Sequence, residues 1–478
     1  MRWTLTQVAG ALGATPGAGL DSLARLAGVS IDSRTIRDGE LFVAIHGPRH
    51  DGHEFVAAAL EQGALAAVVE RAQEGRYSRE VLGRCFVVED TLGALQQLAR
   101  AMRQSWGRRI AGVTGSVGKT TTKEILAALL GARFRVLKSE GNLNNAYGLP
   151  LTLCRLEATD EAAVLEMGMS RRGELRRLAA VARPDVGVVT RVAPAHLEFF
   201  SSVDEIALAK RELIEGLNGS SSVAVLNADD ARVAAFAAYA PGRVVTYGLQ
   251  GLADFRAEAI EDRGAMGSAF DFVSPGGRVR LELPLAGRHM ISNALGALAG
   301  ASVWGVGATE AQRVFPELRP AAMRGELLRF GDDAAVINDC YNSSPAALVA
   351  MVELLAATPN FRRRILAAGE MLELGSTSAE LHREAGRLAV KTGKVDWIIG
   401  VQGNALEIVE GALAMGHPRA QTKFFPSSEL AANYLSRFVA PGDLLLVKGS
   451  RGVKMERIVE ALLALRAPEN APATGAHH

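Results

Sequence analysis

The segment Gly115-Ser-Val-Gly-Lys-Thr120 has the residue pattern of a loop that binds phosphate groups. In such a loop the backbone N–H groups point inward around phosphate oxygens, and glycine permits their close approach. Lys119 would reach the β and γ phosphates of a nucleotide, and the Thr120 hydroxyl would bind Mg²⁺. The full pattern begins with an earlier glycine, where this chain has Val113. A glycine turn with a solvated lysine is the alternative, but the pattern favours nucleotide binding.

Two further polar residues follow apolar runs that read as strands. Glu166 comes directly after Ala163–Leu165, and His196 lies in the loop after Val186–Val189. Parallel strands place their carboxyl ends at one edge of a sheet, where ligands bind. A carboxylate there can hold the Mg²⁺ that bridges nucleotide phosphates, and a histidine there can bind a metal or a carboxylate. Alone, each could instead be an ordinary residue at a strand end.

Lys210 stands where the helical pattern calls for an apolar residue. Ile206, Lys210, Leu213 and Leu217 form one stripe at helical spacing. Burial would lower the pKa of this lysine toward the neutral amine, which can react with CO₂ to give an anionic carbamate. The alternative is a side chain that extends to the surface, and the residues alone favour that alternative.

The elements around these residues predict an α/β protein. The phosphate loop, Thr114–Gly118, lies between a buried strand, Ile110–Val113, and a helix, Thr120–Leu130. A chain of 478 residues exceeds a single core, so we expect three domains. The first hundred residues read as a small α/β domain, and the alternating run Arg278–Pro284 reads as an antiparallel strand. After a Pro-containing hinge at Leu318–Arg324, strands alternate with helices, which predicts a doubly wound sheet. The strands expected there are Ala335–Asn338, Arg364–Ala367, Trp397–Gly400 and Leu444–Val447.

Composition excludes several classes of function. The formal net charge is +1, so no bulk attraction to nucleic acid or membrane is expected. Cys85, Cys154 and Cys340 are scattered thiols without metal-ligand spacing, and this chain shows no signal peptide or apolar membrane span, so a cytoplasmic location is expected. The Pro/Ala/Gly-rich tail 467–478 is expected to be disordered, and its two final histidines read as tail rather than metal site.

Several segments together resemble the Mur ligases of peptidoglycan synthesis, over nearly the whole chain. The segments are Thr114–Glu124, Glu140-Gly-Asn-Leu-Asn-Asn145, Glu166-Met-Gly168, Ala193-Pro-Ala-His196 and Ala209-Lys210. The resemblance implies a UDP-sugar-peptide-binding domain at 1–107 and a central ATP-binding domain with a mostly parallel sheet at 108–318. It also implies a mobile, Rossmann-like ligase domain at 319–478.

The resemblance also implies roles for single residues. Lys119, His196, Lys210 and Arg324 would be the catalytic residues. The ATP contacts would be Thr114, Gly115, Ser116, Val117, Gly118, Lys119, Thr120, Thr121, Asn145, His289, Asn293, Arg324, Asp339 and Tyr341. The magnesium site would be Thr120, Glu166, His196 and a carbamylated Lys210, and this match reverses the preference for a surface-directed Lys210. The UDP-sugar peptide would contact Ser33, Arg34, His53 and Asn144, although which of Asn144 and Asn145 contacts phosphate stays open.

Three positions depart from the family pattern. Met290 stands where the adenine-contact segment commonly has asparagine, and Asn338 and Ser344 depart from an Asp-Asp-x-Tyr-Asn-Ala-Asn-Pro motif. The segments Glu373-Leu-Gly375 and Lys448-Gly-Ser-Arg451 match the family.

The activity that the resemblance implies is a two-step acyl transfer with ATP and Mg²⁺. The carboxylate of UDP-N-acetylmuramoyl-tripeptide would attack the γ-phosphate, and the amine of D-alanyl-D-alanine would attack the resulting acyl phosphate. The enzyme would act as a monomer. A sister ligase that adds one amino acid, or glutamate as in the folylpolyglutamate class, is the second interpretation, although no Asp-Asn-Pro-Arg acceptor motif is found. A P-loop regulator without ligase activity is the third, and Glu166, His196 and Lys210 argue against it.

Overall fold

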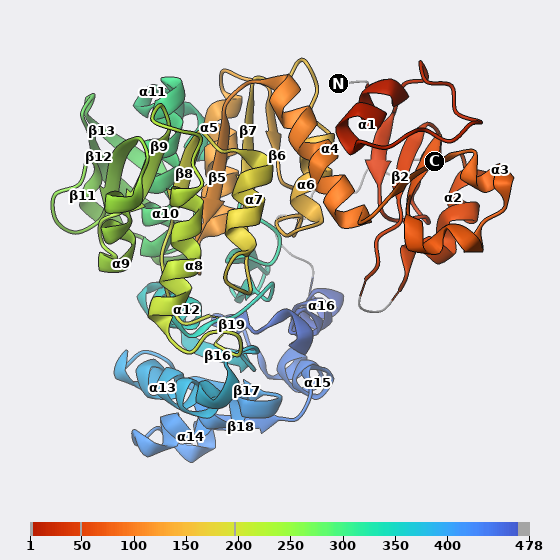
Figure 1. Ribbon diagram of the computed structural model, residues 1–478. Helices are drawn as coiled ribbons and strands as arrows, with labels where there is room; N and C mark the ends of the chain where they lie inside the picture. The colour runs from red at the N-terminus through yellow and green to blue at the C-terminus, as the bar shows by residue number, and fades with distance from the viewer. Residues whose placement is uncertain (1–2, 48–49, 196, 467–478) are drawn as a thin grey trace.

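The computed structural model describes residues 3–47, 50–195 and 197–466. The predicted α/β class with three domains is confirmed, because these residues build three separate sheets. Figure 1 shows three bodies: the N-terminal domain in red and orange, the central domain from orange to green, and the C-terminal domain in blue. Within the described residues, no helix is long and apolar enough to cross a membrane.

The N-terminal domain is a four-stranded parallel sheet in the order β1-β2-β3-β4. Its strands are β1 (Gly28–Ser30), β2 (Glu40–Val43), β3 (Ala66–Glu70) and β4 (Cys85–Val88). Residues of β2 alternate between the two faces: Leu41 and Val43 pack toward helices α1 (Leu5–Leu12) and α4 (Thr91–Trp106), and Phe42 packs toward α2 (Val56–Glu61). Helix α4 also packs on the central domain, so one apolar core continues between the two domains.

The central sheet has nine strands in the order β13-β12-β11-β10-β9-β8-β5-β7-β6. Seven of them, from β6 to β11 in this order, pair in parallel with one another, and β12 and β13 extend the sheet antiparallel. The antiparallel strand predicted at Arg278–Pro284 is therefore confirmed as β13. The strands are β5 (Ile110–Thr114), β6 (Val136–Lys138), β7 (Ala162–Glu166), β8 (Val186–Val189), β9 (Val223–Asn227), β10 (Arg243–Gly248), β11 (Phe255–Asp262), β12 (Ser268–Ser274) and β13 (Gly277–Leu283).

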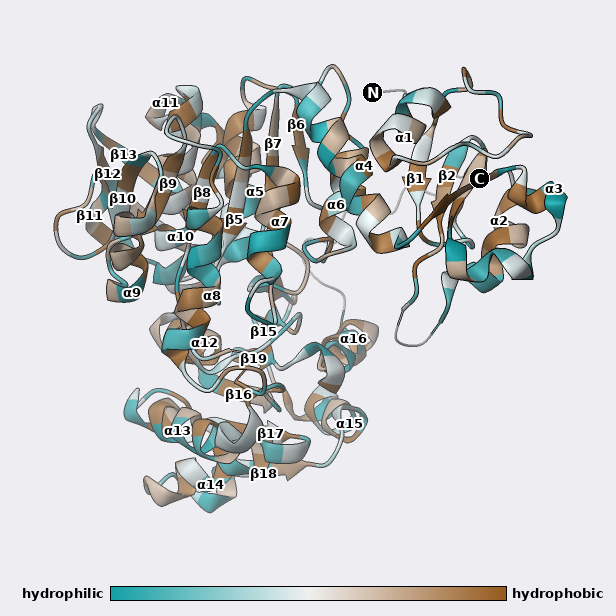
Figure 2. Cartoon of the chain, viewed as in Figure 1, coloured by the Kyte–Doolittle hydropathy of each residue, from teal (hydrophilic) through white to brown (hydrophobic). Residues whose placement is uncertain are grey.

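Helices cover both faces of the central sheet. One face packs against α4, α6 (Gly148–Cys154), α7 (Glu174–Ala182) and α8 (Val203–Glu215), and the other against α5 (Lys119–Gly131), α10 (Arg288–Ala301) and α11 (Ala308–Val314). In Figure 2 the central strands are mainly brown, whereas α4, α7 and α8 carry both brown and teal, as amphipathic helices do. Burial on both faces explains why β5, β7 and β8 are continuous apolar runs.

The C-terminal domain is the doubly wound sheet that the sequence predicts. Its strand order is β14-β15-β19-β16-β17-β18, and only β14 is antiparallel to its neighbour. The strands are β14 (Glu326–Arg329), β15 (Ala335–Asp339), β16 (Arg363–Gly369), β17 (Trp397–Val401), β18 (Thr422–Phe425) and β19 (Asp443–Lys448). Helices α12 (Pro345–Ala357), α13 (Ser378–Lys391) and α14 (Leu406–Ala414) cover one face, and α15 (Ser428–Phe438) and α16 (Glu456–Leu465) cover the other.

The central and C-terminal domains touch beside the link at residues 318–325. The Ala265 N–H donates a hydrogen bond to Thr358 Oγ1 at 3.0 Å, and Ala265 and Ala286 of the central domain pack into the apolar core under α12. The Glu198 N–H donates to the Glu373 carbonyl at 3.2 Å. The central domain contributes the loop after β8 and the turn between β11 and β12 to this junction, and the C-terminal domain contributes the end of α12 and the loop after β16.

Candidate active site

Three strands of the central sheet end side by side at the predicted site. The register pairs Val113 with Glu166 across β5 and β7, and Thr114 with Val189 across β5 and β8. The phosphate loop follows β5, Glu166 ends β7, and Thr190 follows β8. The sheet therefore brings together the groups that the sequence places after separate strands.

The phosphate loop leads directly into the N-terminus of α5. Gly118 is the N-cap with a φ of 87°, in the left-handed region that favours glycine, and a side chain at this position would collide with Asn293 Oδ1. Lys119 Nζ donates to the carbonyl oxygens of Gly115 and Ser116, at 2.9 and 3.3 Å. Burial lowers the pKa of Lys119, and the nearby Arg324 lowers it further, whereas Glu166 opposes the shift. The predicted nucleotide residues Lys119, Asn293 and Arg324 therefore meet around one loop.

The same loop is braced against the segment that follows β8. The Ser116 N–H donates to the Arg191 carbonyl at 2.7 Å, and Ser116 Oγ accepts from the Ala193 N–H at 3.0 Å. The Thr190 hydroxyl donates to the Val117 carbonyl at 2.6 Å. A Cβ at Gly115 would overlap Thr190 Oγ1, which is why glycine is required there. Ser116 therefore connects the phosphate loop to Ala193, and because its hydroxyl oxygen is the acceptor in that bond, the hydroxyl proton can still be donated to a ligand.

Glu166 is a buried carboxylate that joins two loops. Its Oε2 accepts from the Thr120 hydroxyl at 2.8 Å, and its Oε1 accepts from Asn144 Nδ2 at 2.9 Å. Asn145 faces a different partner, since its Oδ1 accepts from the N–H groups of Tyr147 and Gly148 at the start of α6. Asn144 thus belongs to the Glu166–Thr120 cluster, and the amide oxygen of Asn145 holds a helix start.

A buried lysine, Lys123, is linked by hydrogen bonds to the cluster around Glu166. Lys123 is 1% exposed and its Nζ donates to the Ser139 carbonyl at 2.7 Å, with Glu124 Oε1 also at 2.7 Å. Ser139 Oγ accepts from the Glu166 N–H at 3.1 Å. Lys123 therefore connects to the backbone of Glu166 through a single residue.

Lys210 is buried, so the surface-directed alternative is wrong. Its side chain is 1% exposed within α8, where Ile206 and Leu213 on the same stripe are also buried. Burial lowers the pKa of Lys210 well below its usual value, and the charge of Lys119 lowers it further. A neutral amine is therefore favoured beside the phosphate loop. His196, the predicted partner in the metal site, lies outside the described residues.

The predicted nucleotide contacts of the other segments line the junction of the two domains. The Arg324 guanidinium lies 4.1 Å from the centre of the Tyr341 ring, and the Tyr341 N–H donates to the Met323 carbonyl. Asp339 Oδ2 accepts from the buried Lys448 Nζ at 2.6 Å. Burial lowers the pKa of His289, and Lys448 lowers it further, while Asp339 and Asp262 raise it, so His289 also faces this junction.

A pocket opens between α5 and the link to the C-terminal domain. It is lined by Thr121, Glu124, Ile125, Leu285, Ala286, Met290, Leu318, Arg319, Pro320, Ala321, Arg324 and Gly325. Met290 replaces the amide that the family pattern leads one to expect, and its Sδ accepts from Asn293 Nδ2 at 3.8 Å. Most of the lining side chains are apolar, and the pocket borders α5, which follows the phosphate loop.

The predicted substrate residues of the N-terminal domain differ in their surroundings. Arg34 pairs with Asp32 at 2.7 Å and is exposed, so its guanidinium is accessible. Ser33, between them, is half-buried.

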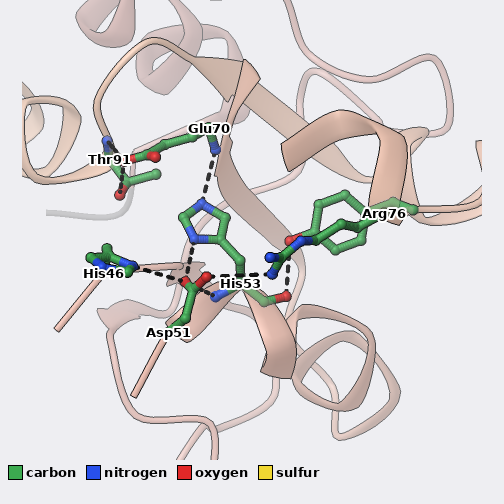
Figure 3. A network of polar contacts seen from close by, with 7 residues as sticks. His46, Asp51, His53, Glu70, Arg76 and Thr91 are labelled. Atoms are coloured by element: carbon green, nitrogen blue, oxygen red, sulfur yellow. Dashed lines mark hydrogen bonds and ion pairs between the residues drawn. The ribbon is translucent and has the colours of Figure 1, made fainter. Parts of the chain in front are cut away.

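His53 is 2% exposed and both of its ring nitrogens are engaged. Its Nε2 accepts from the Glu70 N–H at 3.1 Å, so Nδ1 carries the proton and donates to Asp51 Oδ1 at 2.7 Å (Figure 3). His53 thus orients Asp51, which also contacts Arg76 at 3.4 Å.

The described part of the site fits magnesium. Among the described residues no three His, Cys, Asp or Glu side chains cluster as a metal site. The oxygens of Thr120 and Glu166, 2.8 Å apart at the phosphate loop, are however of the kind that Mg²⁺ takes when nucleotide phosphates supply its other ligands. A magnesium site shared with a bound nucleotide is thus compatible with these residues.

The sequence matches three models of one family. Residues 25–103 match the Mur ligase family, catalytic domain; residues 113–301 match the Mur ligase middle domain; and residues 323–451 match the Mur ligase, glutamate ligase domain. The UDP-N-acetylmuramoyl-tripeptide–D-alanyl-D-alanine ligase of Bacillus subtilis is 34% identical over 91% of this chain and 93% of its own length. The chain belongs to the Mur ligase family. The resemblance inferred from the motifs is thereby confirmed, and with it a ligase class of enzyme.

Other relatives agree with this assignment. The same ligase of Escherichia coli is 33% identical over 91% of this chain and 93% of its own length. A crystal structure of MurF from Acinetobacter baumannii superposes with a TM-score of 0.88 at 27% identity, over 97% of this chain and 99% of that one. MurF ligase from Thermotoga maritima, solved in complex with ADP, has a TM-score of 0.79 at 29% identity, over 91% and 96% of the two chains.

Sequence reasoning gave no role to three buried charged residues of the site region: Lys123, Lys448 and Glu212. Lys123 had a readable signal, because Leu126, Ala127 and Leu130 follow it at helical spacing and are buried. The same argument that singled out Lys210 applies to it. Lys448 was named only as the first residue of a segment that matches the family, and its place at the end of a buried strand is the signal for a role. Glu212 follows Arg211 and precedes Leu213, and nothing in the sequence distinguishes it from an exposed helical glutamate.

Proposed function

We propose that this Mur ligase joins D-alanyl-D-alanine to UDP-N-acetylmuramoyl-tripeptide and cleaves ATP to ADP and phosphate in doing so. The observation that carries the proposal is the meeting of Lys119, the Glu166–Thr120 pair and buried Lys210 at one sheet edge, in a chain whose relatives bear this name. Such a cluster can hold two negatively charged groups, a phosphoryl group and an attacking carboxylate, close to each other.

In the proposed first step, an oxygen of the peptide carboxylate attacks the γ-phosphorus of ATP, and the bond to ADP breaks. Two anions must approach each other, and Lys119 and Arg324 offset their repulsion. In the second step the amine of the dipeptide attacks the carbonyl carbon of the acyl phosphate, and phosphate leaves. The approach of Arg324 to Lys119 from the C-terminal domain supports the idea that domain closure assembles this charge.

We assign the metal-binding role to Thr120 and Glu166, with His196 and Lys210 completing the set. Magnesium would supply charge neutralisation between the nucleotide phosphates and the carboxylate. The neutral amine nitrogen of Lys210 would attack the carbon of CO₂, form an N–C bond and release a proton to solvent. The resulting carbamate would place a negative charge where the fold buries an amine.

We propose nucleotide contacts at the phosphate loop and its first helical residues, at Asn293 and His289, and at Arg324, Asp339 and Tyr341. Asn144, beside Glu166, would face the reacting groups, and Asn145 would act by holding the start of α6. Ser33 and Arg34 would bind the UDP-sugar, whereas His53 would act through Asp51 because both of its ring nitrogens are occupied.

We also propose functional boundaries and a setting for the enzyme. The UDP-sugar peptide would be bound by residues 1–107, ATP by 108–318, and the dipeptide by 319–478. All named groups come from one chain, so the enzyme would act as a monomer. Its three cysteines are free thiols, which suits the reducing cytoplasm.

The test is release of phosphate by the purified chain with ATP, Mg²⁺, UDP-N-acetylmuramoyl-tripeptide and D-alanyl-D-alanine. Phosphate should appear at the full rate only when all four are present, and the assay run with tripeptides ending in diaminopimelate and in lysine identifies which of the two the enzyme uses. Equal release without the dipeptide, or with a single amino acid in its place, would reject the proposal. Lys119→Ala, which removes the phosphate-loop amine, is the inactive control.

The carbamate gives a first prediction about a variant. Lys210→Ala should lose at least about 100-fold in kcat, since a charged group at the reaction centre is removed. Short carboxylates such as acetate or propionate should restore part of that rate, because they can occupy the space and carry the charge. Retention of full activity by Lys210→Ala would show that no carbamate is needed.

A further inference from the structure

Helix α8 carries a second buried ionisable residue, two positions after Lys210. The Glu212 side chain is 2% exposed. Its two oxygens accept from the Gly173 N–H at 2.9 and 3.0 Å, and Oε2 also accepts from the Arg176 N–H at 3.1 Å. The Arg176 guanidinium lies 3.9 Å away and is largely exposed. Glu212 is thus satisfied almost entirely by backbone groups of another helix.

Those backbone groups form the start of α7. Gly173 is the N-cap of α7 and has no side chain that could accept the first N–H groups of the helix. Glu212, which lies on α8, accepts N–H groups at the start of α7 instead. Its negative charge is favoured near a helix N-terminus. Gly173 has a φ of 88°, in the left-handed region, where a capping serine or aspartate would be strained. The arrangement in the structure instead fastens one helix to another.

On its other sides α8 packs closely over small residues. A Cβ at Gly216 would meet the Ala179 Cβ of α7 at 2.6 Å, and a Cβ at Gly187 of β8 would meet Leu217 Cδ2 at 2.9 Å. The two helices lie side by side over the sheet in Figure 1. Small residues let α8 lie near both α7 and the sheet, but apolar contacts of this kind permit sliding and rotation.

The geometry of an α-helix relates Glu212 to Lys210. Residues two apart differ by about 200° around the helix axis, so they face different neighbours. Glu212 faces the start of α7, whereas Lys210 is buried on another side of α8, near enough to Lys119 of the phosphate loop for that charge to lower its pKa. Directional hydrogen bonds at residue 212 therefore fix the rotation of α8 about its axis and its position along that axis. The position of the Lys210 amine depends on both.

We propose that Glu212 is a positioning residue that holds Lys210 at the phosphate-loop edge by fastening α8 to the start of α7. The inference rests on the proposed role of Lys210 in the ligase reaction. Glu212 would not touch the substrate or the nucleotide. Its effect would reach the reaction only through the lysine.

The test compares Glu212→Gln with Glu215→Gln in the full-length chain. Glu215 is on the same helix, pairs with Arg211 at 2.7 Å and is partly exposed, so its variant controls for charge removal from α8. Glutamine at 212 keeps the size but puts an N–H₂ where one of the two oxygens accepts. We expect kcat to fall about 10- to 100-fold, as for residues that orient a site ligand. The Kd for ADP, set by the phosphate loop, should change less than about twofold.

A second readout follows Lys210 directly. In ¹³C-labelled bicarbonate the wild-type chain should give a carbamate signal in ¹³C NMR that Lys210→Ala lacks. The signal should weaken in Glu212→Gln and persist in Glu215→Gln. If Glu212→Gln does not fold by circular dichroism, Glu212→Asp, which keeps the charge but shortens the reach, is judged by the same two readouts.

The outcomes separate the two proposals. Glu212 variants that keep both kcat and the carbamate signal overturn the positioning role, and so does a loss of ADP affinity equal to the loss of kcat, which would mean general damage to the fold. A wild-type chain without a carbamate signal, together with an active Lys210→Ala, would instead reject the role of Lys210 itself.

Discussion

At the residue scale, the site is built from buried charges whose partners are mostly backbone groups. Lys123 donates to a carbonyl oxygen, Glu212 accepts from N–H groups, and both are almost fully buried. Bonds to the backbone cannot rotate away as side-chain pairs can, so each charge fixes a segment of chain. Removal of such a charge leaves a buried polar group without a partner, which costs more than the bond itself contributes.

Lys123 provides a direct test of this principle. In Lys123→Met the Ser139 carbonyl loses its donor, and we expect the free energy of unfolding to fall by about 1 to 3 kcal/mol. The Glu166 N–H contact with Ser139 Oγ should loosen as well, so more Mg²⁺ should be required for half-maximal activity. Urea unfolding and a magnesium titration measure the two effects.

Lys138→Met is the matched control for Lys123→Met. Lys138 pairs with the other oxygen of Glu124 but is 45% exposed, so its loss should cost less than about 0.5 kcal/mol. Equal losses for the two variants would contradict the role given to burial.

His382 predicts a dependence of stability on pH. It is fully buried, its Nε2 accepts from the Met371 N–H at 2.8 Å, and burial lowers its pKa below the usual 6.5. Because the folded state binds this proton less readily than the unfolded chain, the contribution to stability is complete above about pH 6.5 and is lost as pH falls toward the lowered pKa.

The measurement compares wild type with His382→Gln, which keeps an acceptor for the Met371 N–H but does not titrate. The difference in free energy of unfolding between the two proteins should shift in favour of the variant between about pH 7 and pH 5. Parallel curves over that range would show that His382 does not titrate as argued.

At the element scale, the fold depends on helices that approach the sheet closely over glycine. Gly112 and Gly187 lie on β5 and β8 under α8, and a Cβ at Gly112 would meet Leu213 Cδ1 and Met167 Sδ at 3.1 Å. These glycines are in strand interiors, where glycine is otherwise unfavourable. The local cost is offset by the packing that brings Lys210 to the sheet edge.

Gly187→Val isolates this close approach. Valine suits a strand, so β8 itself should tolerate it, but the new side chain would meet Leu217 Cδ2 and Ile214 Cδ1 of the α8 segment. We expect a loss of about 1 to 3 kcal/mol in stability from overpacking and a loss of ligase activity larger than the loss of ADP affinity. Thermal unfolding, the phosphate assay and ADP titration measure these.

The control is Gly10→Ala in α1, where no atom lies within 4 Å of the new Cβ. It should leave activity unchanged and raise stability by up to about 1 kcal/mol. If Gly187→Val keeps the stability and activity that Gly10→Ala keeps, then the close packing of α8 on β8 is not required for either.

The sequence predicts helices and strands well where the spacing of apolar residues follows a single period. The strand predicted at Val186–Val189 is β8 to the residue, and the alternating run at Arg278–Pro284 is antiparallel β13, as expected. Strands such as β9 and β14 were not expected, because Val223–Asn227 and Glu326–Arg329 are short runs that could equally lie in loops or helices. Their pairing partners, which decide the matter, are distant in the chain.

The site was predictable to the extent that its residues break a local pattern. Lys210 is a charge on an apolar stripe, and Glu166 is a charge after an apolar run. His53 shows the limit of such reasoning, since only the fold reveals that Glu70 and Asp51 occupy its two nitrogens. Asn144 and Asn145 are neighbours of the same type, and only their different contacts, Glu166 and the start of α6, distinguish them.

At the scale of the whole molecule, the described residues of the central and C-terminal domains are joined by the Ala265 N–H bond to Thr358 and the Glu198 N–H bond to Glu373. Ala265 and Ala286 also pack into the apolar core under α12, and Arg324 lies near enough to Lys119 to lower its pKa. A junction of this kind can open and close, as an enzyme with three reactants requires.

Thr358→Val tests the junction. Thr358 is 1% exposed, and valine keeps the shape while leaving the Ala265 N–H without an acceptor. We expect a more open average arrangement, seen as a larger radius of gyration in small-angle X-ray scattering, and about a 5- to 30-fold weaker kcat/KM from a loss of about 1 to 2 kcal/mol in the closed state.

Thr392→Val is the companion variant, since Thr392 donates only within its own domain, to the Ala389 carbonyl. It should scatter X-rays and turn over as the wild type does. An unchanged radius and rate in Thr358→Val would mean that this bond does not hold the domains together.

The contact between Gly115 and Thr190 bears on how such a chain can evolve. The phosphate loop and the segment after β8 come from different parts of the sequence, yet a single methyl group at position 115 would overlap Thr190 Oγ1 and lie 3.1 Å from the Arg191 nitrogen. Mutational drift at either place is therefore restricted by the other. Related chains should preserve the two positions as a pair, and a substitution tolerated at one should be found together with a compensating change in the second.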